Sequence, residues 1–132
     1  MLLNLSNHPS HLWDEKQIKS AKDAFGSVAD LPFPSVLPDA ETGEIEILVK
    51  EYLQICLNRL NESIGTSNAV HLMGELTFSF GLAALLQQAG IRCVASTSER
   101  KVQSNSQGEK TVKFEFCRFR EYPLLISLNN RP

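Results

Sequence analysis

Short apolar runs alternate with helical patterns along this chain, and that alternation narrows the folds open to it. Apolar runs predict strands at residues 2–5, 27–33, 69–73, 91–95 and 111–118. Between the first four, apolar residues recur at helical spacing, which predicts helices that end at Gly26 and that cover residues 44–60 and 76–89. The last two strands are separated by a turn-like stretch at 104–108.

The element order β-α-β-α-β-α-β-β favours a parallel sheet, because parallel neighbours need long crossover connections. We predict an α/β, Rossmann-like fold with a mostly parallel sheet and a C-terminal antiparallel hairpin. The first strand, residues 2–5, should lie inside the sheet beside residues 69–73. One domain is expected over residues 1–128, followed by a loose tail at 129–132.

Capping residues and apolar faces set the helix predictions. Ser10 is placed to cap the first helix, with Asp14 and Glu15 in its first turn. The third helix is apolar nearly all round from 78 to 86, more than one sheet face can cover. We therefore predict a homodimer that uses this helix.

Composition excludes several classes of function. Of the 132 residues, 42% are hydrophobic and 21% are charged, which is typical of a globular domain. The net charge of −2 argues against a duplex nucleic acid partner, which would need a basic face. No apolar run approaches the ~20 residues of a membrane span, and the start lacks the basic region of a signal peptide. We expect a cytoplasmic protein with no membrane partner.

The motifs of several cofactor and enzyme classes are missing. The chain has no GxGxxG, no GxxxxGK[ST] and no GxSxG sequence. Cys56, Cys93 and Cys117 have no zinc-like spacing, and their apolar surroundings predict buried, reduced thiols. We expect neither a cofactor nor a metal ion.

The candidate site residues follow three predicted strands, because ligands of open α/β sheets bind at the carboxyl ends of strands. Small hydroxyl, amide and glycine residues there could turn donors toward phosphate or ribose. The candidates are Asn7, His8 and Ser10; Gly74, Glu75 and Thr77; and Ser96, Thr97, Ser98 and Arg100.

Several candidates also have a plain structural explanation. Ser10 and Thr77 could be helix caps, and Glu75 could favour a helix N-terminus. Gly74 could serve a tight turn or a close backbone approach. Arg100 is the preferred phosphate partner, because a guanidinium binds in a fixed bidentate geometry, but it could be a solvated hairpin charge.

Two further histidines are expected to have no direct role. His71 lies within a predicted strand and is expected to be a packed core residue. His11 is expected to be solvated on the first helical turn.

The opening run Met-Leu-Leu-Asn-Leu-Ser-Asn-His-Pro resembles the first strand and loop of small stand-alone CRISPR-associated proteins with a Rossmann-like fold. The run Val-His-Leu-Met-Gly-Glu-Leu-Thr-Phe at 70–78 is similar to their second ligand-binding strand and turn. This resemblance implies a homodimer that binds cyclic oligoadenylate, most simply cyclic tetra-adenylate, the second messenger of type III CRISPR defence.

By the same resemblance, the protein would be a ring nuclease that linearises its ligand without metal. The ligand's own 2′-hydroxyl would attack the phosphodiester, so the protein need only align the groups and stabilise charge. His8, Glu75 and Arg100 would then be base, ribose-orienting group and phosphate clamp. Two alternatives stay open, namely a non-catalytic sequestering or scaffold dimer and a nucleoside or sugar-phosphate enzyme.

Overall fold

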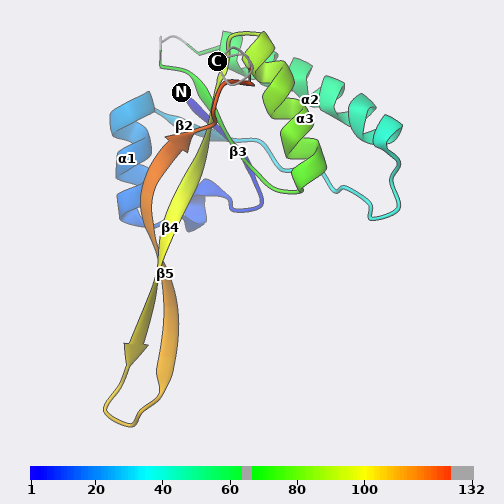
Figure 1. The fold of residues 1–132 in the computed structure, drawn as a ribbon. Helices are drawn as coiled ribbons and strands as arrows, with labels where there is room; N and C mark the ends of the chain where they lie inside the picture. The colour runs from blue at the N-terminus through cyan, green and yellow to red at the C-terminus, as the bar shows by residue number, and fades with distance from the viewer. Residues whose placement is uncertain (64–66, 126–132) are drawn as a thin grey trace, which may run out of the picture.

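The computed structural model describes residues 1–63 and 67–125, and it has the predicted α/β architecture (Figure 1). Its five strands form one sheet in the order β2-β1-β3-β4-β5. All neighbours are parallel except β4 and β5. The elements are β1 (Leu2–Ser6), α1 (Glu15–Phe25), β2 (Val28–Asp30), α2 (Thr42–Asn61), β3 (Ala69–Met73), α3 (Leu76–Gln88), β4 (Arg92–Ser104) and β5 (Lys110–Glu121).

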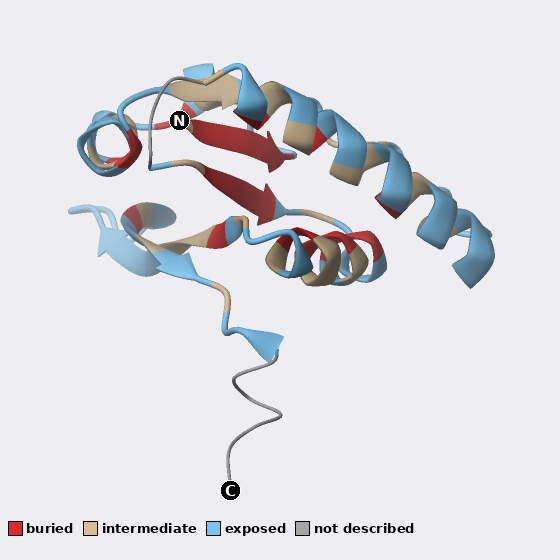
Figure 2. Cartoon of the chain, turned by 90° about the horizontal axis from the view of Figure 1, so that it is seen from above, coloured by how far each residue is buried: buried red, intermediate tan, exposed pale blue. Residues whose placement is uncertain are grey.

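The predicted central position of β1 is confirmed, since β1 pairs with β2 on one side and with β3 on the other. Figure 2 shows these two inner strands as the buried centre of the molecule. The predicted tail at 129–132 lies outside the described residues.

Side chains that alternate along the inner strands build a core on each face of the sheet. On one face, Leu3, Leu5, Val70 and Leu72 pack with buried residues of α2 and α3. On the other face, Leu2, Ala69 and Val94 pack with Trp13 and with Ala21 and Phe25 of α1.

The start of α1 differs from the prediction. Asp14 is the N-cap, and its side chain accepts a 2.8 Å hydrogen bond from the Gln17 N–H. Ser10 instead opens a short 3-10 helix (Ser10–Leu12), and its hydroxyl donates to Asp30 at 2.6 Å. Gly26 ends α1 with φ of 86°, as predicted.

The other helices lie close to their predicted ranges. A capping box of Glu41 and Glu44 starts α2. Buried residues of α3 pack against the sheet, but Leu76 and Phe80 are 82% and 67% exposed. The outer face of α3 is therefore apolar and uncovered in the single chain. Within the described residues, no helix has the length and apolar character needed to cross a bilayer.

Strand lengths show the largest departures from the sequence predictions. β2 stops at Asp30, two residues before Pro32, because proline cannot donate to the sheet ladder. The strand predicted at 91–95 is longer than expected, since β4 continues to Ser104 with a partner on β5 for each residue from Val94 onward. Residues 96–101, expected to leave the strand, are therefore part of it. The hairpin therefore projects well beyond the sheet (Figure 1). We call residues 98–116 the arm.

Apolar residues at every second position of β5 differ in burial. Val112 and Phe114 are exposed, whereas Phe116 is buried. Opposite Thr97 and Ser98, the register moves from Arg118 to Phe116, which leaves Cys117 in a bulge. Cys117 is exposed, contrary to the prediction, whereas Cys56 and Cys93 are buried as predicted.

Candidate functional site

One face of the sheet changes from apolar to polar along its strands. Near the amino ends, this face presents Leu2 and Ala69 to α1. Toward the carboxyl ends, the same alternation presents Asn4 and then Ser6 on β1, with His71 as the partner of Asn4 on β3. Asn4, Ser6 and His71 are all buried.

A cleft of about 580 Å³ opens over these polar strand ends, and we call it the carboxyl-edge cleft. It is bounded by β1 and the loop after it, by the start of α1, by the end of β3 and by the root of the arm. Its lining residues are Ser6, Asn7, His8, Leu12, Trp13, Asp14, Gln17, His71, Met73, Gly74, Ser96, Ser98, Phe114 and Phe116. None of these lining residues is a lysine or an arginine.

Half of the predicted site residues meet in this cleft. They are Asn7, His8, Gly74, Ser96 and Ser98. They come from the loop after β1, the turn after β3 and the strand β4, which meet at one edge of the sheet. The other five, Ser10, Glu75, Thr77, Thr97 and Arg100, are not among the lining residues.

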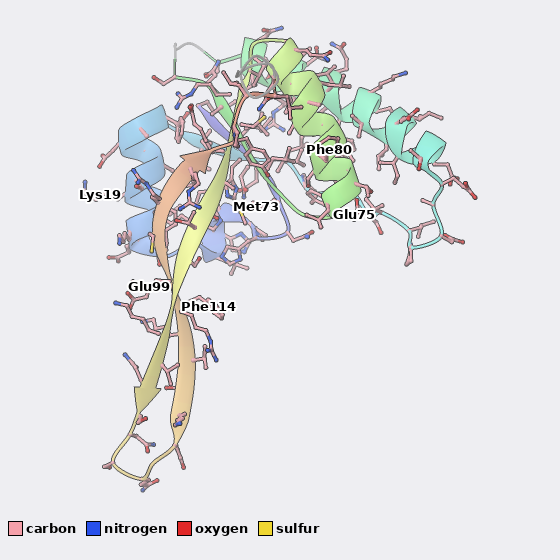
Figure 3. The ribbon with its side chains drawn as sticks, viewed as in Figure 1. Lys19, Met73, Glu75, Phe80, Glu99 and Phe114 are labelled. Atoms are coloured by element: carbon pink, nitrogen blue, oxygen red, sulfur yellow. The ribbon has the colours of Figure 1, made fainter. Side chains whose placement is uncertain are left out.

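Glu75 and Thr77 serve the start of α3. The Glu75 carboxylate accepts hydrogen bonds from the N–H of Thr77 at 3.1 Å, from the N–H of Phe78 at 2.8 Å and from the Thr77 hydroxyl. The Phe78 N–H and the Thr77 hydroxyl hold the pKa of this carboxyl below its usual value. Figure 3 shows Glu75 at the first turn of α3, where it is the N-cap.

The remaining three predicted residues have other neighbours. The Ser10 N–H and hydroxyl both donate to Asp30. The Thr97 hydroxyl donates to the carbonyl of Arg118 across the hairpin at 3.2 Å. Arg100 is exposed on the arm, where it pairs with Phe114, itself a lining residue of the cleft.

Gly74 allows a close approach, one of the two roles predicted for it. A Cβ atom at this position would lie 2.2 Å from the Phe33 ring, far inside van der Waals contact. Phe33 packs edge-on against Phe78, with ring centroids 5.2 Å apart. The glycine therefore lets the segment after β2 cross the end of β3.

A chain of hydrogen bonds runs from the cleft into the sheet. His71 Nε2 lies 3.1 Å from Ser96 Oγ, and His71 Nδ1 lies 2.8 Å from Asn4 Oδ1. Because an amide oxygen only accepts, Nδ1 carries the proton and donates to Asn4. Nε2 therefore holds the lone pair and accepts from the Ser96 hydroxyl.

Asn4 is held in place within this series of hydrogen bonds, because both its amide oxygen and its amide nitrogen have partners. Its oxygen also accepts from the Ser6 hydroxyl at 2.8 Å. Its Nδ2 group donates to the His8 carbonyl at 3.0 Å and to Asp30 at 2.8 Å. Burial raises the pKa of Asp30, but the hydrogen bonds from Ser10 and Asn4 outweigh it and hold that pKa below its ordinary value.

His71 is buried and neutral at physiological pH. Burial, with a smaller contribution from the charge of His8, lowers its pKa to about 4. Trp13 and Phe119 pack edge-on against the ring, with centroids 5.3 and 5.6 Å away. The predicted packed histidine is confirmed, yet its ring also lines the cleft.

Among the lining residues that the sequence predictions missed are Ser6, Trp13 and His71. The predictions also missed Asn4, the hydrogen-bond partner of His71. For Asn4, Ser6 and His71 a signal is present, because these polar residues interrupt apolar strands. Burying a polar side chain in a central strand costs free energy unless the side chain forms hydrogen bonds. Three such residues on one face therefore indicate a hydrogen-bonded group. Within the described residues, no three His, Cys, Asp or Glu side chains are grouped as a metal site.

Comparison of the sequence with known proteins assigns the chain to a family. No curated protein and no solved structure matches the chain. The sequence model described as the Uncharacterized protein MJ1673 family matches residues 1–120, which takes in every element except the last residue of β5. The chain therefore belongs to the MJ1673 family.

Proposed function

We propose that the protein binds a cyclic oligoadenylate in the carboxyl-edge cleft and opens the ring as a ring nuclease. The observation that carries the proposal is the mixed lining of the cleft. Hydroxyl and imidazole groups of Ser6, His8 and Ser98 lie in the same cavity as the aromatic rings of Trp13 and Phe114. Adenine bases stack on aromatic rings, while ribose and phosphate oxygens take hydrogen bonds from hydroxyl and imidazole groups.

His8 is the group in this proposal that moves a proton. It lies in the loop after β1, is exposed, and lines the cleft. Its backbone is held on both sides, because its carbonyl accepts from Asn4 and from the Trp13 indole, and its N–H donates to Ser6. A held backbone with a free imidazole suits transfer of a proton from the ribose 2′-hydroxyl or to the departing 5′-oxygen.

Arg100 is the phosphate partner in this proposal. Arg100 follows Ser98 by two positions on β4, so the alternation of the strand gives both residues the same side. Its partner across the hairpin, Phe114, lines the cleft. A guanidinium at this rim would supply the positive charge that the lining lacks.

The proposal includes a homodimer formed through the outer side of α3. Leu76 and Phe80 of α3 and Ile47 of α2 are exposed, and a mostly apolar groove of about 610 Å³ lies between these helices. An apolar surface of this kind is unusual on a chain that stays monomeric.

The test is incubation of the purified protein with labelled cyclic tri-, tetra- and hexa-adenylate, with binding and products measured separately. We expect tetra-adenylate to bind and to give a linear product that ends in a 2′,3′-cyclic phosphate. Cleavage should persist with a chelator, since the attacking group belongs to the substrate. A 2′-deoxy analogue should bind but stay intact.

Two variants separate the possible outcomes. His8→Ala should lower the cleavage rate by about 10²–10⁴-fold with little change in affinity. The matched control is His11→Ala, on the short 3-10 helix that follows the same loop. Binding without cleavage would favour the sequestering dimer. If no ring size binds, the proposed function is wrong.

A further inference from the structure

The chain from Ser96 to His71 to Asn4 has the connectivity of a nucleophile, a base and an orienting group. A serine hydroxyl meets Nε2 of an imidazole, and the opposite nitrogen donates to a fixed acceptor. The three residues come from β4, β3 and β1, which are adjacent strands of a rigid sheet. Of the three, Ser96 and His71 line the carboxyl-edge cleft.

We propose that Ser96 is a nucleophile, activated by His71, toward phosphoryl esters that enter the carboxyl-edge cleft. This reaction is separate from the ring opening proposed above, in which the substrate's own hydroxyl attacks. It uses the same cavity but a residue of the protein as the attacking group.

Ser96 Oγ forms a bond to phosphorus while its proton passes to His71 Nε2. The bond from phosphorus to the leaving oxygen breaks, and that oxygen takes the proton from Nε2. Water then attacks the serine ester, gives a proton to Nε2, and releases Ser96 with its hydroxyl restored.

The surroundings of His71 support this assignment. Nδ1 is committed to Asn4, so Nε2 keeps its lone pair toward Ser96. The positive ring formed during attack would be stabilised by Asn4 Oδ1, whose amide is polarised by its hydrogen bond to Asp30. Burial keeps the ring neutral before attack, and so ready to accept a proton.

Met73 competes with His71 for the hydrogen bond of the Ser96 hydroxyl, but it is the weaker acceptor. Met73 Sδ lies 3.1 Å from Ser96 Oγ and accepts the Ser96 N–H at 3.3 Å. A thioether sulfur is a poor acceptor compared with an imidazole nitrogen. Met73 therefore holds the Ser96 backbone through its N–H, and the Ser96 hydroxyl donates its hydrogen bond to His71 Nε2.

Ser98 provides a matched control. It lines the same cleft on the same strand, and no hydrogen bond joins it to a histidine among the described residues. An electrophile that labels Ser96 should therefore leave the Ser98 hydroxyl unlabelled, and Ser96→Ala should abolish the reaction.

The experiment is labelling of the intact protein with a fluorophosphonate probe, located by peptide mass spectrometry. We expect one adduct, on Ser96, and a loss of at least tenfold in Ser96→Ala and His71→Gln. The control is Ser104→Ala, which changes an exposed serine at the far end of the same strand, outside the cleft, and should keep the labelling. Absence of an adduct, or equal labelling of Ser96 and Ser98, would overturn the inference. The readout needs no oligoadenylate, so it stands or fails apart from the proposed function.

A second variant covers the case in which His71→Gln does not fold. Ser96→Cys puts a thiol at the same point, and iodoacetamide should alkylate it at least tenfold faster than the thiol of Ser98→Cys. The exposed Cys117 gives an internal reference rate in both proteins. Equal rates at the two positions would show that His71 does not activate position 96.

Discussion

Acidification from pH 7 to pH 5 should destabilise the folded protein through one buried side chain, His71. The folded state holds this imidazole neutral, with Nδ1 donating to Asn4. The unfolded chain exposes it to water, where it takes up a proton near pH 6.5. Stability is therefore complete above about pH 6.5 and decreases as the pH falls, because only the unfolded state binds the proton.

The magnitude follows from the two pKa values. Burial lowers the pKa of His71 from 6.5 to about 4. At about 1.4 kcal/mol for each pH unit, the free energy of unfolding should fall by about 2 kcal/mol at pH 5 and by about 3 kcal/mol at pH 4. For a small domain whose stability is on the order of 5–15 kcal/mol, that is a large fraction.

The assay is urea unfolding at pH 7, 6 and 5, followed by circular dichroism and by the fluorescence of Trp13, the single tryptophan. Hydrogen bonds hold the pKa values of Asp30 and Glu75 below their ordinary values, so these carboxylates stay ionised through this window. His71→Gln should remove most of the pH dependence, and His11→Gln, at an exposed position, should keep it.

Equal stability of the wild-type protein at pH 7 and pH 5 would refute this reasoning. So would an unchanged pH dependence in His71→Gln. If that variant does not fold, an NMR titration of the wild-type imidazole gives the answer directly, since a His71 resonance that titrates near pH 6.5 contradicts its burial as a neutral donor.

Three further predictions concern the cleft and the surface. Gly74→Ala should lower the free energy of unfolding by about 1–3 kcal/mol, because the new methyl group meets the Phe33 ring. Chemical denaturation should show a smaller loss when the same change is made in a Phe33→Ala background. Arg100→Ala should weaken oligoadenylate binding by about 1.5–3 kcal/mol in a fluorescence titration, with partial rescue by lysine, and unchanged affinity would leave Arg100 a solvated hairpin charge. The double variant Leu76→Ser, Phe80→Ser should be monomeric by light scattering where the parent is dimeric, and a monomeric parent at all concentrations would remove the dimer from the proposal.

The sequence was sufficient for the element order because that order depends on local patterns. A short apolar run located β3 at its observed bounds, Ala69–Met73, and Gly26 marked the end of α1. The extension of β4 was missed because the run Ser96-Thr97-Ser98 is typical of loops. Its strand conformation depends on β5, where the partner of Thr97 is Arg118, and such pairing has no local signal.

The candidate site was predictable only in part for the same reason. Asn7, His8 and Gly74 follow strands, so the position rule for parallel sheets found them. The link between Asn4 and His71 joins residues 67 positions apart and depends on the register of β1 and β3. Each residue by itself is an ordinary exception in an apolar strand. The pair gains meaning only when the strands are placed side by side.

The polar centre of the sheet has a consequence for how this chain can change under selection. Asn4, Ser6 and His71 stand where the adjacent rows of the same strands hold leucine, alanine and valine. Apolar residues of similar volume at such positions often make a protein more stable, because no polar group then has to leave water. Mutations that replace these polar side chains by apolar ones would thus raise the stability of the fold. Only selection for the function of the cleft would oppose them. A lineage released from that demand should drift toward leucine and valine at these three positions while its fold survives intact.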